Sequence, residues 1–331
     1  MMRDVIYVAA GSSALRPVLA APARPVDCLG VTRGALYLKT AAPPGVLAVL
    51  THDAVRLPCG LVLPPTSAEL PLTSLTPAHS WGILIGNGEV RWTGPDGPVV
   101  IRAVREWAPA RPVRGEVAAS ALAAVRSVLG RTGLCGAGLG GAGLGSSGLS
   151  GSGLSAAGTN AADPVASSSL LAELGAAAGD RSAATAAATR LLGSGPGLTP
   201  SGDDVLTGFL AGAAAFGLDA AALREATAVL APGRTTALSA ALLWHAARGE
   251  CIDELAAVAA ALTSYGRPEP RQAADALRRL LSVGHTSGAA LALGLVTAAE
   301  LALRAQPLLA ETVSAETVLA ETVLAETGSA A

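Results

Sequence analysis

The sequence predicts an α+β protein, in which a β-rich N-terminal domain is followed by a mainly α-helical C-terminal domain. Up to about residue 115, short apolar runs are broken by Gly and Pro, which is typical of strands. From about Ala161 to Arg304, long Ala and Leu stretches carry Arg and Glu at three- and four-residue spacing, which is typical of helices. We therefore place a β-rich domain at 1–115, a connecting helix at 116–132 and a helical domain at 161–305.

The individual elements of the N-terminal domain can be predicted from its turns. The strand candidates are the apolar runs VDCLGVT, ALYLKT, GVLAVLT and CGLVLP. A hairpin is predicted in WGILIGNGEVRWTG, because Asn87-Gly88 suits a two-residue type I′ turn between GILIG and EVRWT. A helix from about Val117 to Leu129 is expected next, followed by six or seven helices in the C-terminal domain.

Two low-complexity segments interrupt this plan. Residues 133–160 form a Gly/Ser/Leu insert in which Gly-Leu recurs every five residues, and residues 306–331 form a tail in which Ala-Glu-Thr recurs. A period of five residues fits neither a helix nor a strand, and a Gly/Ser-rich composition favours a flexible segment. We therefore exclude both segments from the search for a functional site.

Composition excludes several classes of function. The 331 residues carry a net charge of −2, which argues against a nucleic-acid partner. The longest strongly apolar runs hold about fourteen residues and fall short of the ~20 that a membrane helix needs. The N-terminus lacks the form of a signal peptide. The cysteines are widely spaced and are expected to be buried free thiols: Cys28, Cys59, Cys135 and Cys251. We expect a cytoplasmic protein with no membrane partner.

The most distinctive stretch is GSGPGLTPSGDD, at residues 193–204, which precedes the apolar helical run VLTGFLAGAAAFG. Its glycines alternate with Ser and Pro, an arrangement that is costly in backbone entropy. Glycines ahead of a helix N-terminus bring backbone N–H groups close to a phosphate. The loop has no Lys where a P-loop carries one, so the sequence does not indicate a P-loop NTPase.

A structural alternative explains part of this loop. Ser201 and Asp204 have capping-box spacing, in which the Ser201 hydroxyl accepts from the Asp204 N–H and the Asp204 carboxylate accepts from the Ser201 N–H. Asp203 has no role in such a box and is free to bind Mg²⁺, to orient a ligand N–H or to face solvent. Asp203 and Asp204 are therefore weak candidates for metal ligands, and Mg²⁺ is the only cofactor that the sequence suggests.

Two later segments repeat the design of glycine and hydroxyl groups at a helix start. The first is GRTTALSAALLWHAARGE and the second is GHTSGAALALG. Each alone is an ordinary N-cap signal. If the three helix starts converge, they form an anion pocket, with Arg234 as a fork for a carboxylate or phosphate and His285 as a proton donor or acceptor. Segments more than ~10 Å apart would contradict this hypothesis.

His245 is interpreted differently, because it lies in the middle of the helix predicted after Gly233. Leu238, Leu242 and Gly249 share its face, so a core or interface histidine is expected there rather than a ligand. No Ser/His/Asp or Cys/His signature is legible, since a triad is defined by geometry rather than by sequence position.

The stretch GPGLTPSGDDVLTGFLAG closely resembles the signature of the family named after the AllH subunit of oxamate carbamoyltransferase. RTTALSAALLWHAARGE and GHTSGAALALGL are similar to the two later motifs of that family, in the same order. The resemblance covers roughly residues 185–300. It implies carbamoyl transfer between carbamoyl phosphate and oxamate, which gives oxalurate and phosphate. The reverse reaction is oxalurate phosphorolysis, a late step of anaerobic allantoin breakdown.

The resemblance also implies partners and residue roles. Small anionic substrates and other carbamoyltransferase subunits are the implied partners. The catalytic candidates are His285 as general acid or base, Arg234 as charge clamp, and Asp203 to orient an amide N–H or hold a metal. The substrate-binding candidates are Ser194, Gly195, Gly197, Thr199, Ser201, Gly202, Asp204, Thr235, Thr236, Thr286 and Ser287.

Two other functions remain open from the sequence. The chain could be a non-catalytic subunit that binds a small anion or serves in assembly. It could also be a Mg²⁺-dependent phosphate-handling enzyme that uses Asp203 and Asp204.

Overall fold

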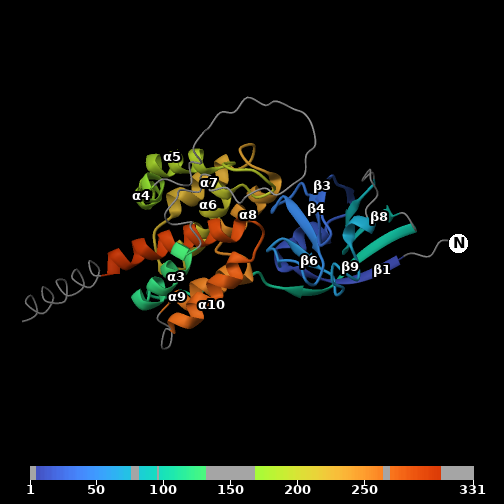
Figure 1. Ribbon diagram of the computed structural model, residues 1–331. Helices are drawn as coiled ribbons and strands as arrows, with labels where there is room; N and C mark the ends of the chain where they lie inside the picture. The colour runs from blue at the N-terminus through green and yellow to red at the C-terminus, as the bar shows by residue number, and fades with distance from the viewer. Residues whose placement is uncertain (1–4, 76–81, 95–96, 132–167, 264–268, 307–331) are drawn as a thin grey trace, which may run out of the picture.

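The computed structural model describes residues 5–75, 82–94, 97–131, 168–263 and 269–306. Figure 1 shows a sheet-containing part, which holds the first described residues, beside a part built from helices. The predicted α+β class is therefore confirmed. The whole Gly/Ser/Leu insert, residues 133–160, lies outside the described residues, as do Cys135 within it and the repetitive tail beyond Gln306.

The N-terminal part is built around one mixed sheet of nine strands. The strands are β1 (Val5–Ser12), β2 (Arg24–Pro25), β3 (Cys28–Val31), β4 (Ala35–Lys39), β5 (Val46–Leu50), β6 (Gly60–Val62), β7 (Leu84–Gly86), β8 (Glu89–Gly94) and β9 (Gly97–Trp107). Their order in the sheet is β2-β7-β8-β9-β1-β6-β5-β4-β3. β1 is parallel to β9 and β5 is parallel to β6, whereas the other neighbours are antiparallel.

The strands predicted from local patterns are present. The four apolar runs contain β3, β4, β5 and β6 in order, and every residue of β5 is buried. The predicted hairpin joins β7 and β8, with Gly86 paired to Glu89. Asn87 and Gly88 have φ values of 55° and 82°, and two positive φ values are what a type I′ turn requires. The turn prediction is therefore confirmed.

The helices begin with short elements in the N-terminal part. These are the 3₁₀ turn η1 (Ser13–Leu15), α1 (Arg16–Ala20) and α2 (Leu72–Leu75). The longer helices are α3 (Ala119–Arg131), α4 (Ser168–Ala176), α5 (Arg181–Leu191), α6 (Ser201–Phe216), α7 (Ala221–Leu230), α8 (Ala237–Ala247), α9 (Asp253–Leu262), α10 (Pro270–Leu281) and the helix Ser287–Gln306. α3 lies where the connecting helix was predicted.

In its described residues, the predicted helical region contains eight helices, α4 to α10 and the helix Ser287–Gln306, whereas six or seven were expected. Glycines with positive φ explain why several of these helices end where they do. Gly179 (φ 117°), Gly217 (φ 75°) and Gly249 (φ 73°) follow the ends of α4, α6 and α8. Glycine adopts this conformation without the Cβ clash of other residues and so terminates helices readily.

α6 is buried along most of its length and packs closely against the helix Ser287–Gln306. A Cβ at Gly208 would lie 2.0 Å from the carbonyl oxygen of Leu291, and a Cβ at Gly294 would lie 2.1 Å from that of Val205. Only glycine permits this approach of two backbones. These motif glycines therefore set the spacing of the two helices that carry the first and third motifs.

The two parts of the chain are joined through α8 and the segment after it. Leu238 and Ala241 of α8 pack in the hydrophobic core of the sheet-containing part. The backbone N–H of Cys251 donates to the carbonyl of Ala110 at 2.9 Å, which forms an antiparallel bridge. The second motif is thus fixed against both parts of the molecule.

The helix Ser287–Gln306 is longer than the apolar run that the sequence suggested. It has 20 residues and a mean hydropathy of 1.5, so by length and composition it is the one helix of the described residues that could cross a membrane. However, 61% of the most apolar stretch of this helix is buried inside the molecule, and Leu295 and Ala299 belong to the core. Packing inside the protein therefore accounts for its apolar character.

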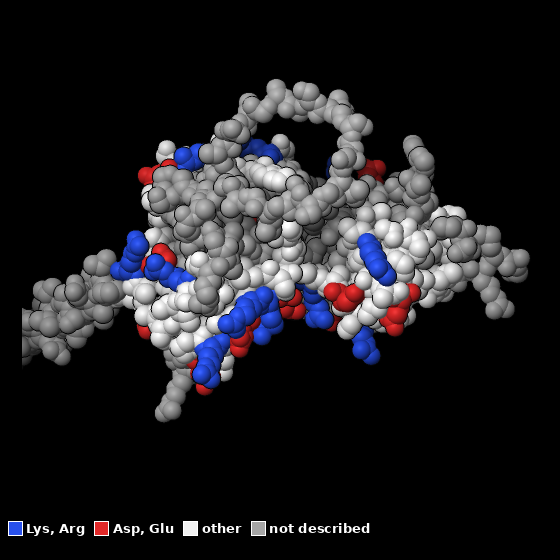
Figure 2. Space-filling model, viewed as in Figure 1, with Lys and Arg blue, Asp and Glu red and all other residues white. Residues whose placement is uncertain are grey.

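Figure 2 shows the charges on one face of the molecule. Along the lower edge of this view, Lys and Arg side chains lie beside those of Asp and Glu. This mixture agrees with the small net charge of −2.

Candidate functional site

A cavity of about 180 Å³ lies between the sheet-containing and helical parts. Its N-terminal wall consists of Tyr37, Val55, Leu57 and Pro58. The remaining walls come from the glycine-rich loop, α6, α8, the segment around the start of α9, and the helix Ser287–Gln306 with the segment that precedes it. The lining is mostly apolar, with a few polar side chains that include Thr199, Asp204, Thr207, Glu250 and Ser287. Concave, mainly apolar surfaces with few polar groups are typical of small-molecule sites.

The three sequence motifs meet beside this cavity. The Thr236 hydroxyl donates to the carbonyl of Leu198 at 2.6 Å, which joins the second motif to the glycine-rich loop. The hydroxyls of Thr199 and Ser287 are 2.8 Å apart, which joins the loop to the third motif. The segments are therefore in direct contact, as the convergence hypothesis required, whereas the roles assigned to their residues stay predictions.

Positive φ values explain why the loop is rich in glycine. Gly193, Gly195 and Gly197 have φ values of 75°, 106° and 101°. A Cβ at Gly193 would lie 2.3 Å from the carbonyl oxygen of Arg234. Other residues at these positions would be strained, and at Gly193 they would also push the second motif away from the loop.

The loop presents a run of backbone donors just ahead of α6. Within the described part of the chain, no hydrogen bond is made by the N–H groups of Gly195, Gly197, Leu198 and Thr199. Ser194 and Gly202 hold the loop closed instead, because the Gly202 N–H donates to the Ser194 carbonyl at 2.9 Å. Free N–H groups in a glycine-rich turn before a helix N-terminus suit an anion.

The predicted capping box is wrong. α6 has Pro200 as its N-cap, and no side chain caps it. The Asp204 N–H donates to the Pro200 carbonyl at 3.2 Å rather than to the Ser201 hydroxyl. Since Ser201 is the first residue of the helix, Asp204 lies about one turn inside it. Its side chain faces the cavity instead of the helix end.

Asp203 is a structural link between the first two motifs. Its Oδ1 accepts from the Gly193 N–H at 2.9 Å, and its Oδ2 accepts from the Thr235 hydroxyl. The residue is buried, and this burial raises the pKa of its carboxyl while the Thr235 and Gly193 hydrogen bonds oppose the rise. Both oxygens are used within the chain, and the described residues contain no group of three or more potential metal ligands.

Asp204 differs from its neighbour in having a free oxygen. Its Oδ2 is buried with no hydrogen-bond partner among the described residues, and the residue is 4% exposed. Burial, followed by the charge of Asp203, raises the pKa of Asp204 to about 7, although hydrogen bonding from Ser287 and Thr199 opposes this. A carboxyl that titrates near neutral pH can both accept and deliver a proton.

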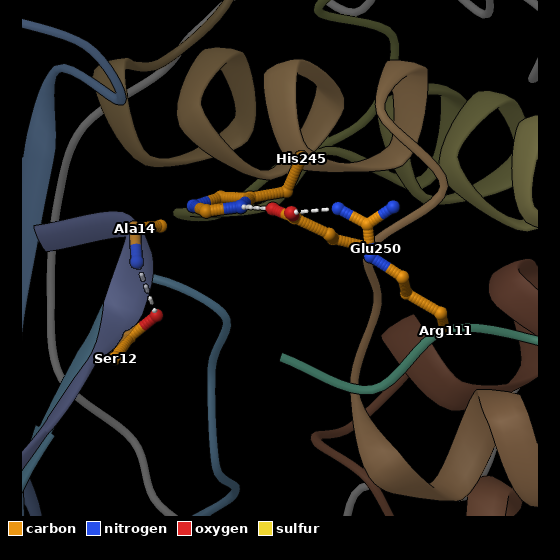
Figure 3. Close-up of polar contacts among 5 residues, drawn as sticks. All are labelled: Ser12, Ala14, Arg111, His245 and Glu250. Atoms are coloured by element: carbon orange, nitrogen blue, oxygen red, sulfur yellow. Dashed lines mark hydrogen bonds and ion pairs between the residues drawn. The ribbon is translucent and has the colours of Figure 1, made fainter. Parts of the chain in front are cut away.

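Glu250 lines the same cavity and was not among the predicted site residues. Its Oε2 lies 2.7 Å from Nδ1 of His245, and its Oε1 accepts from the Arg111 guanidinium at 2.7 Å. Figure 3 shows the three side chains in a row, with Glu250 in the middle. Burial alone would raise the pKa of Glu250, but hydrogen bonds from His245 and Arg111 outweigh it and lower the pKa. Glu250 is therefore ionised at neutral pH.

His245 is fully buried, which confirms the prediction of a core histidine. A sequence signal for its partner existed, since His245 and Glu250 flank the turn at Gly249, where φ is 73°. Without the fold, nothing indicated that this turn faces a cavity.

Two predicted catalytic residues lie outside the cavity lining. Arg234 is exposed, and its guanidinium donates to the carbonyl of Thr189 at 3.3 Å. His285 and Thr286 are exposed in the turn that precedes the helix Ser287–Gln306. The described lining of the cavity contains no Lys or Arg. An anion held deep in this cavity by Arg234 and His285 is therefore not the arrangement observed.

The cysteines of the described residues are free, as predicted. Cys59 and Cys251 are buried, whereas Cys28 is only partly buried. Cys251 lines the cavity, and burial raises the pKa of its thiol to about 12. A thiol that stays neutral is a poor nucleophile.

The chain is therefore a two-part protein with a cavity beside three helix starts. Residues 191–299 match the model of a protein family described as oxamate carbamoyltransferase subunit AllH. The match spans about a third of the chain and contains all three motifs, so this segment is AllH-like and the resemblance seen in the sequence is confirmed. No solved structure matches the chain.

Proposed function

We propose that the chain is a subunit of an oxamate carbamoyltransferase and that its cavity takes part in transfer of the carbamoyl group between carbamoyl phosphate and oxamate. The observation that carries this proposal is Asp204, a buried carboxyl with a free oxygen in a cavity, inside the segment that matches the family model. Other carbamoyltransferase subunits are the partners that the family description implies, so the cavity would act within a complex.

The chemistry requires a group that exchanges one proton. A bond forms between the amide nitrogen of oxamate and the carbamoyl carbon, and the bond from that carbon to the bridging phosphate oxygen breaks. Phosphate leaves with the bonding electrons, and the attacking nitrogen loses a proton. Ionised Asp204 would accept this proton, and protonated Asp204 would return it in the reverse direction. A pKa of about 7 keeps both forms populated at neutral pH.

The phosphate and carboxylate groups are assigned to the glycine-rich loop rather than to the cavity interior. The loop offers free N–H groups before α6, while the described lining offers no cation. A buried charge without a partner is costly, so the anionic end of a substrate would remain near the loop. Arg234, whose backbone lies against Gly193, would then act as a charge clamp at the mouth of the site.

Binding is tested by thermal-shift titration with phosphate, carbamoyl phosphate, oxamate and oxalurate, each with and without Mg²⁺. A ligand that binds only the folded state stabilises it by about 2.7 kcal/mol at a hundredfold excess over its Kd. Arg234→Ala is expected to remove the shift given by carbamoyl phosphate, whereas Arg271→Ala, at an exposed position of α10, is expected to retain it. An equal shift in both variants would contradict the clamp.

Turnover distinguishes the catalytic proposal from a non-catalytic anion-binding or assembly subunit. Oxalurate formation is measured in the complex with partner subunits, using Asp204→Asn, His285→Ala and the exposed control Asp275→Asn. Loss of turnover in Asp204→Asn with retained binding supports Asp204 as the proton carrier. Loss in His285→Ala alone assigns that role to His285, and full turnover in both variants supports the non-catalytic alternative.

A further inference from the structure

The cavity has a second acidic side chain, Glu250, which takes no part in the proton transfer proposed for Asp204. We propose that Glu250 determines the specificity of the cavity by accepting a hydrogen bond from an amide or carbamoyl N–H of the ligand. The cavity would then bind the nitrogen end of the substrate and reject a carboxylate in the same place. The identity of that substrate rests on the proposed function, whereas the preference for an amide rests on the cavity itself.

The polar lining of the cavity is rich in acceptors. Ionised Glu250 only accepts hydrogen bonds, and the buried Oδ2 of Asp204 has no donor among the described residues. No Lys or Arg is present in the described lining to neutralise an anionic ligand. A carboxylate would therefore meet like charge in an apolar enclosure, whereas a neutral NH₂ group supplies two donors without adding charge.

Glu250 is held in one orientation from two sides. His245, on α8, contacts Oε2, and Arg111, in the segment between the sheet and α3, contacts Oε1. Each carboxylate oxygen can accept more than one hydrogen bond, so both contacts leave capacity for a ligand. Side chains fixed in this way recognise a ligand without the entropy cost of ordering them.

The surroundings strengthen such a hydrogen bond. Leu238, Leu242 and Ile252 share the lining with Glu250 and keep its neighbourhood apolar. Hydrogen bonds to a charged group are stronger where water is excluded. A metal ion is a poorer occupant, because the described residues contain no set of three potential ligands.

The inference is tested with oxamate and oxalate, which share one carboxylate and differ in having an amide or a second carboxylate. Affinities are measured calorimetrically on the full chain, alone and with its partner subunits. The wild type is expected to prefer oxamate by roughly tenfold or more, the worth of about one hydrogen bond to a charged group. Equal binding of the two ligands would overturn the inference without any variant.

Variants test whether Glu250 is the source of the preference for oxamate over oxalate. Glu250→Gln, whose amide can donate as well as accept, is expected to reduce the preference to less than about threefold, chiefly through tighter oxalate binding. Glu225→Gln, in an exposed ion pair on α7, is the matched control and is expected to keep the preference. An unchanged preference in folded Glu250→Gln would leave Glu250 a purely structural residue.

A second variant, Arg111→Met, tests the inference if Glu250→Gln does not fold. Arg111→Met keeps Glu250 and His245 but removes one of the two contacts that fix the carboxylate, at a side chain that is 62% exposed. Its preference for oxamate is expected to fall between those of wild type and Glu250→Gln. A preference equal to that of the wild type would contradict the positioning role of Arg111.

Failure of this inference can be distinguished from failure of the proposed function. A complex that forms oxalurate but binds oxalate as tightly as oxamate retains the proposed function and refutes amide recognition. A complex that forms no oxalurate, yet binds acetamide in preference to acetate as well as oxamate in preference to oxalate, retains amide recognition and refutes the proposed function.

Discussion

Asp204 on α6 and Glu250 after α8 are carboxyl groups in the walls of one cavity, but their surroundings move their pKa values in opposite directions. Burial, followed by the charge of the neighbouring Asp203, raises the pKa of Asp204 to about 7. Glu250 is also buried, yet two donors stabilise its ionised form and lower its pKa. The charge of the neighbours accounts for the difference, because the carboxylate of Asp203 raises the pKa of Asp204, whereas the guanidinium of Arg111 lowers that of Glu250.

The largest effect expected from this difference is on turnover. Asp204→Asn should lower kcat by roughly 10²–10⁴-fold, because a positioned acid or base contributes about that much. Glu250→Gln should raise the KM for oxamate more than it lowers kcat, since it alters recognition. Steady-state kinetics of oxalurate formation in the reconstituted complex separate the two. Equal losses of kcat in both variants would show that Asp204 and Glu250 do not have separate roles in catalysis and recognition.

A smaller effect, on stability, separates Asp203 from Asp204. Asp203→Ala leaves the Gly193 N–H and the Thr235 hydroxyl without their shared partner. Unpaired buried groups cost about 1–3 kcal/mol each, and Gly193 and Thr235 are only half-buried, so a loss of about 2–4 kcal/mol in the free energy of unfolding is expected. Asp204→Asn should cost much less at neutral pH. Urea denaturation of both variants tests this, and equal losses would show that both carboxyls are structural.

The pH dependence of stability should have opposite signs at the two sites. The folded-state pKa of Asp204, about 7, exceeds the ordinary aspartate value of 3.8, so folding binds a proton between these pH values. Stability from this group therefore falls as pH rises from about 4 to 7, and Asp204→Asn should gain about 1–3 kcal/mol relative to wild type over that range.

Glu250 should behave in the reverse way. Because its folded-state pKa is lowered, its contribution is present at neutral pH and is lost as pH falls through that value. Glu250→Gln should therefore destabilise the protein more at pH 7 than at pH 4. Urea denaturation across this range measures both slopes, with Asp275→Asn as the exposed control. Parallel slopes for the two variants would contradict the assigned pKa directions.

The smallest effect is expected at the contact between the loop and the third motif. Thr199→Val removes the hydrogen bond between the hydroxyls of Thr199 and Ser287, and should cost about 0.5–1.5 kcal/mol of unfolding free energy. It should also raise the pKa of Asp204 further, because one of the opposing hydrogen bonds is lost. A pH–rate profile checks this, since the limb assigned to Asp204 should move to higher pH.

Much of the fold could be predicted from the sequence because its signals are local. Asn87-Gly88 specifies its own turn, and the apolar runs around β3 to β6 specify short strands. The meeting of three motifs was likewise predictable from their shared design. The different contacts of Asp203 and Asp204 could not be predicted, because they depend on whether Ser201 or Pro200 is the N-cap of α6. A shift of one residue decides which carboxyl faces the loop and which the cavity.

The remaining differences come from contacts between distant segments. Glu250 lies 139 residues from Arg111, and only the folded chain brings them together. Arg234 has the charge expected of a clamp, but its guanidinium turns to the carbonyl of Thr189. The packing of the two parts of the molecule decides what these side chains contact, and residue type alone does not predict that packing.

The N-terminal wall of the cavity lies outside the segment that matches the family model. Tyr37, Val55, Leu57 and Pro58 shape this wall, whereas Asp204, Glu250 and the glycine-rich loop all fall within residues 191–299. One apolar wall of the cavity and its two carboxyl groups are therefore encoded in separate stretches of the chain. Exchanging a few side chains of the sheet-containing part would resize this wall of the cavity while leaving Asp204 and Glu250 in place. The segment that matches the family model thus leaves one boundary of the cavity to the rest of the chain.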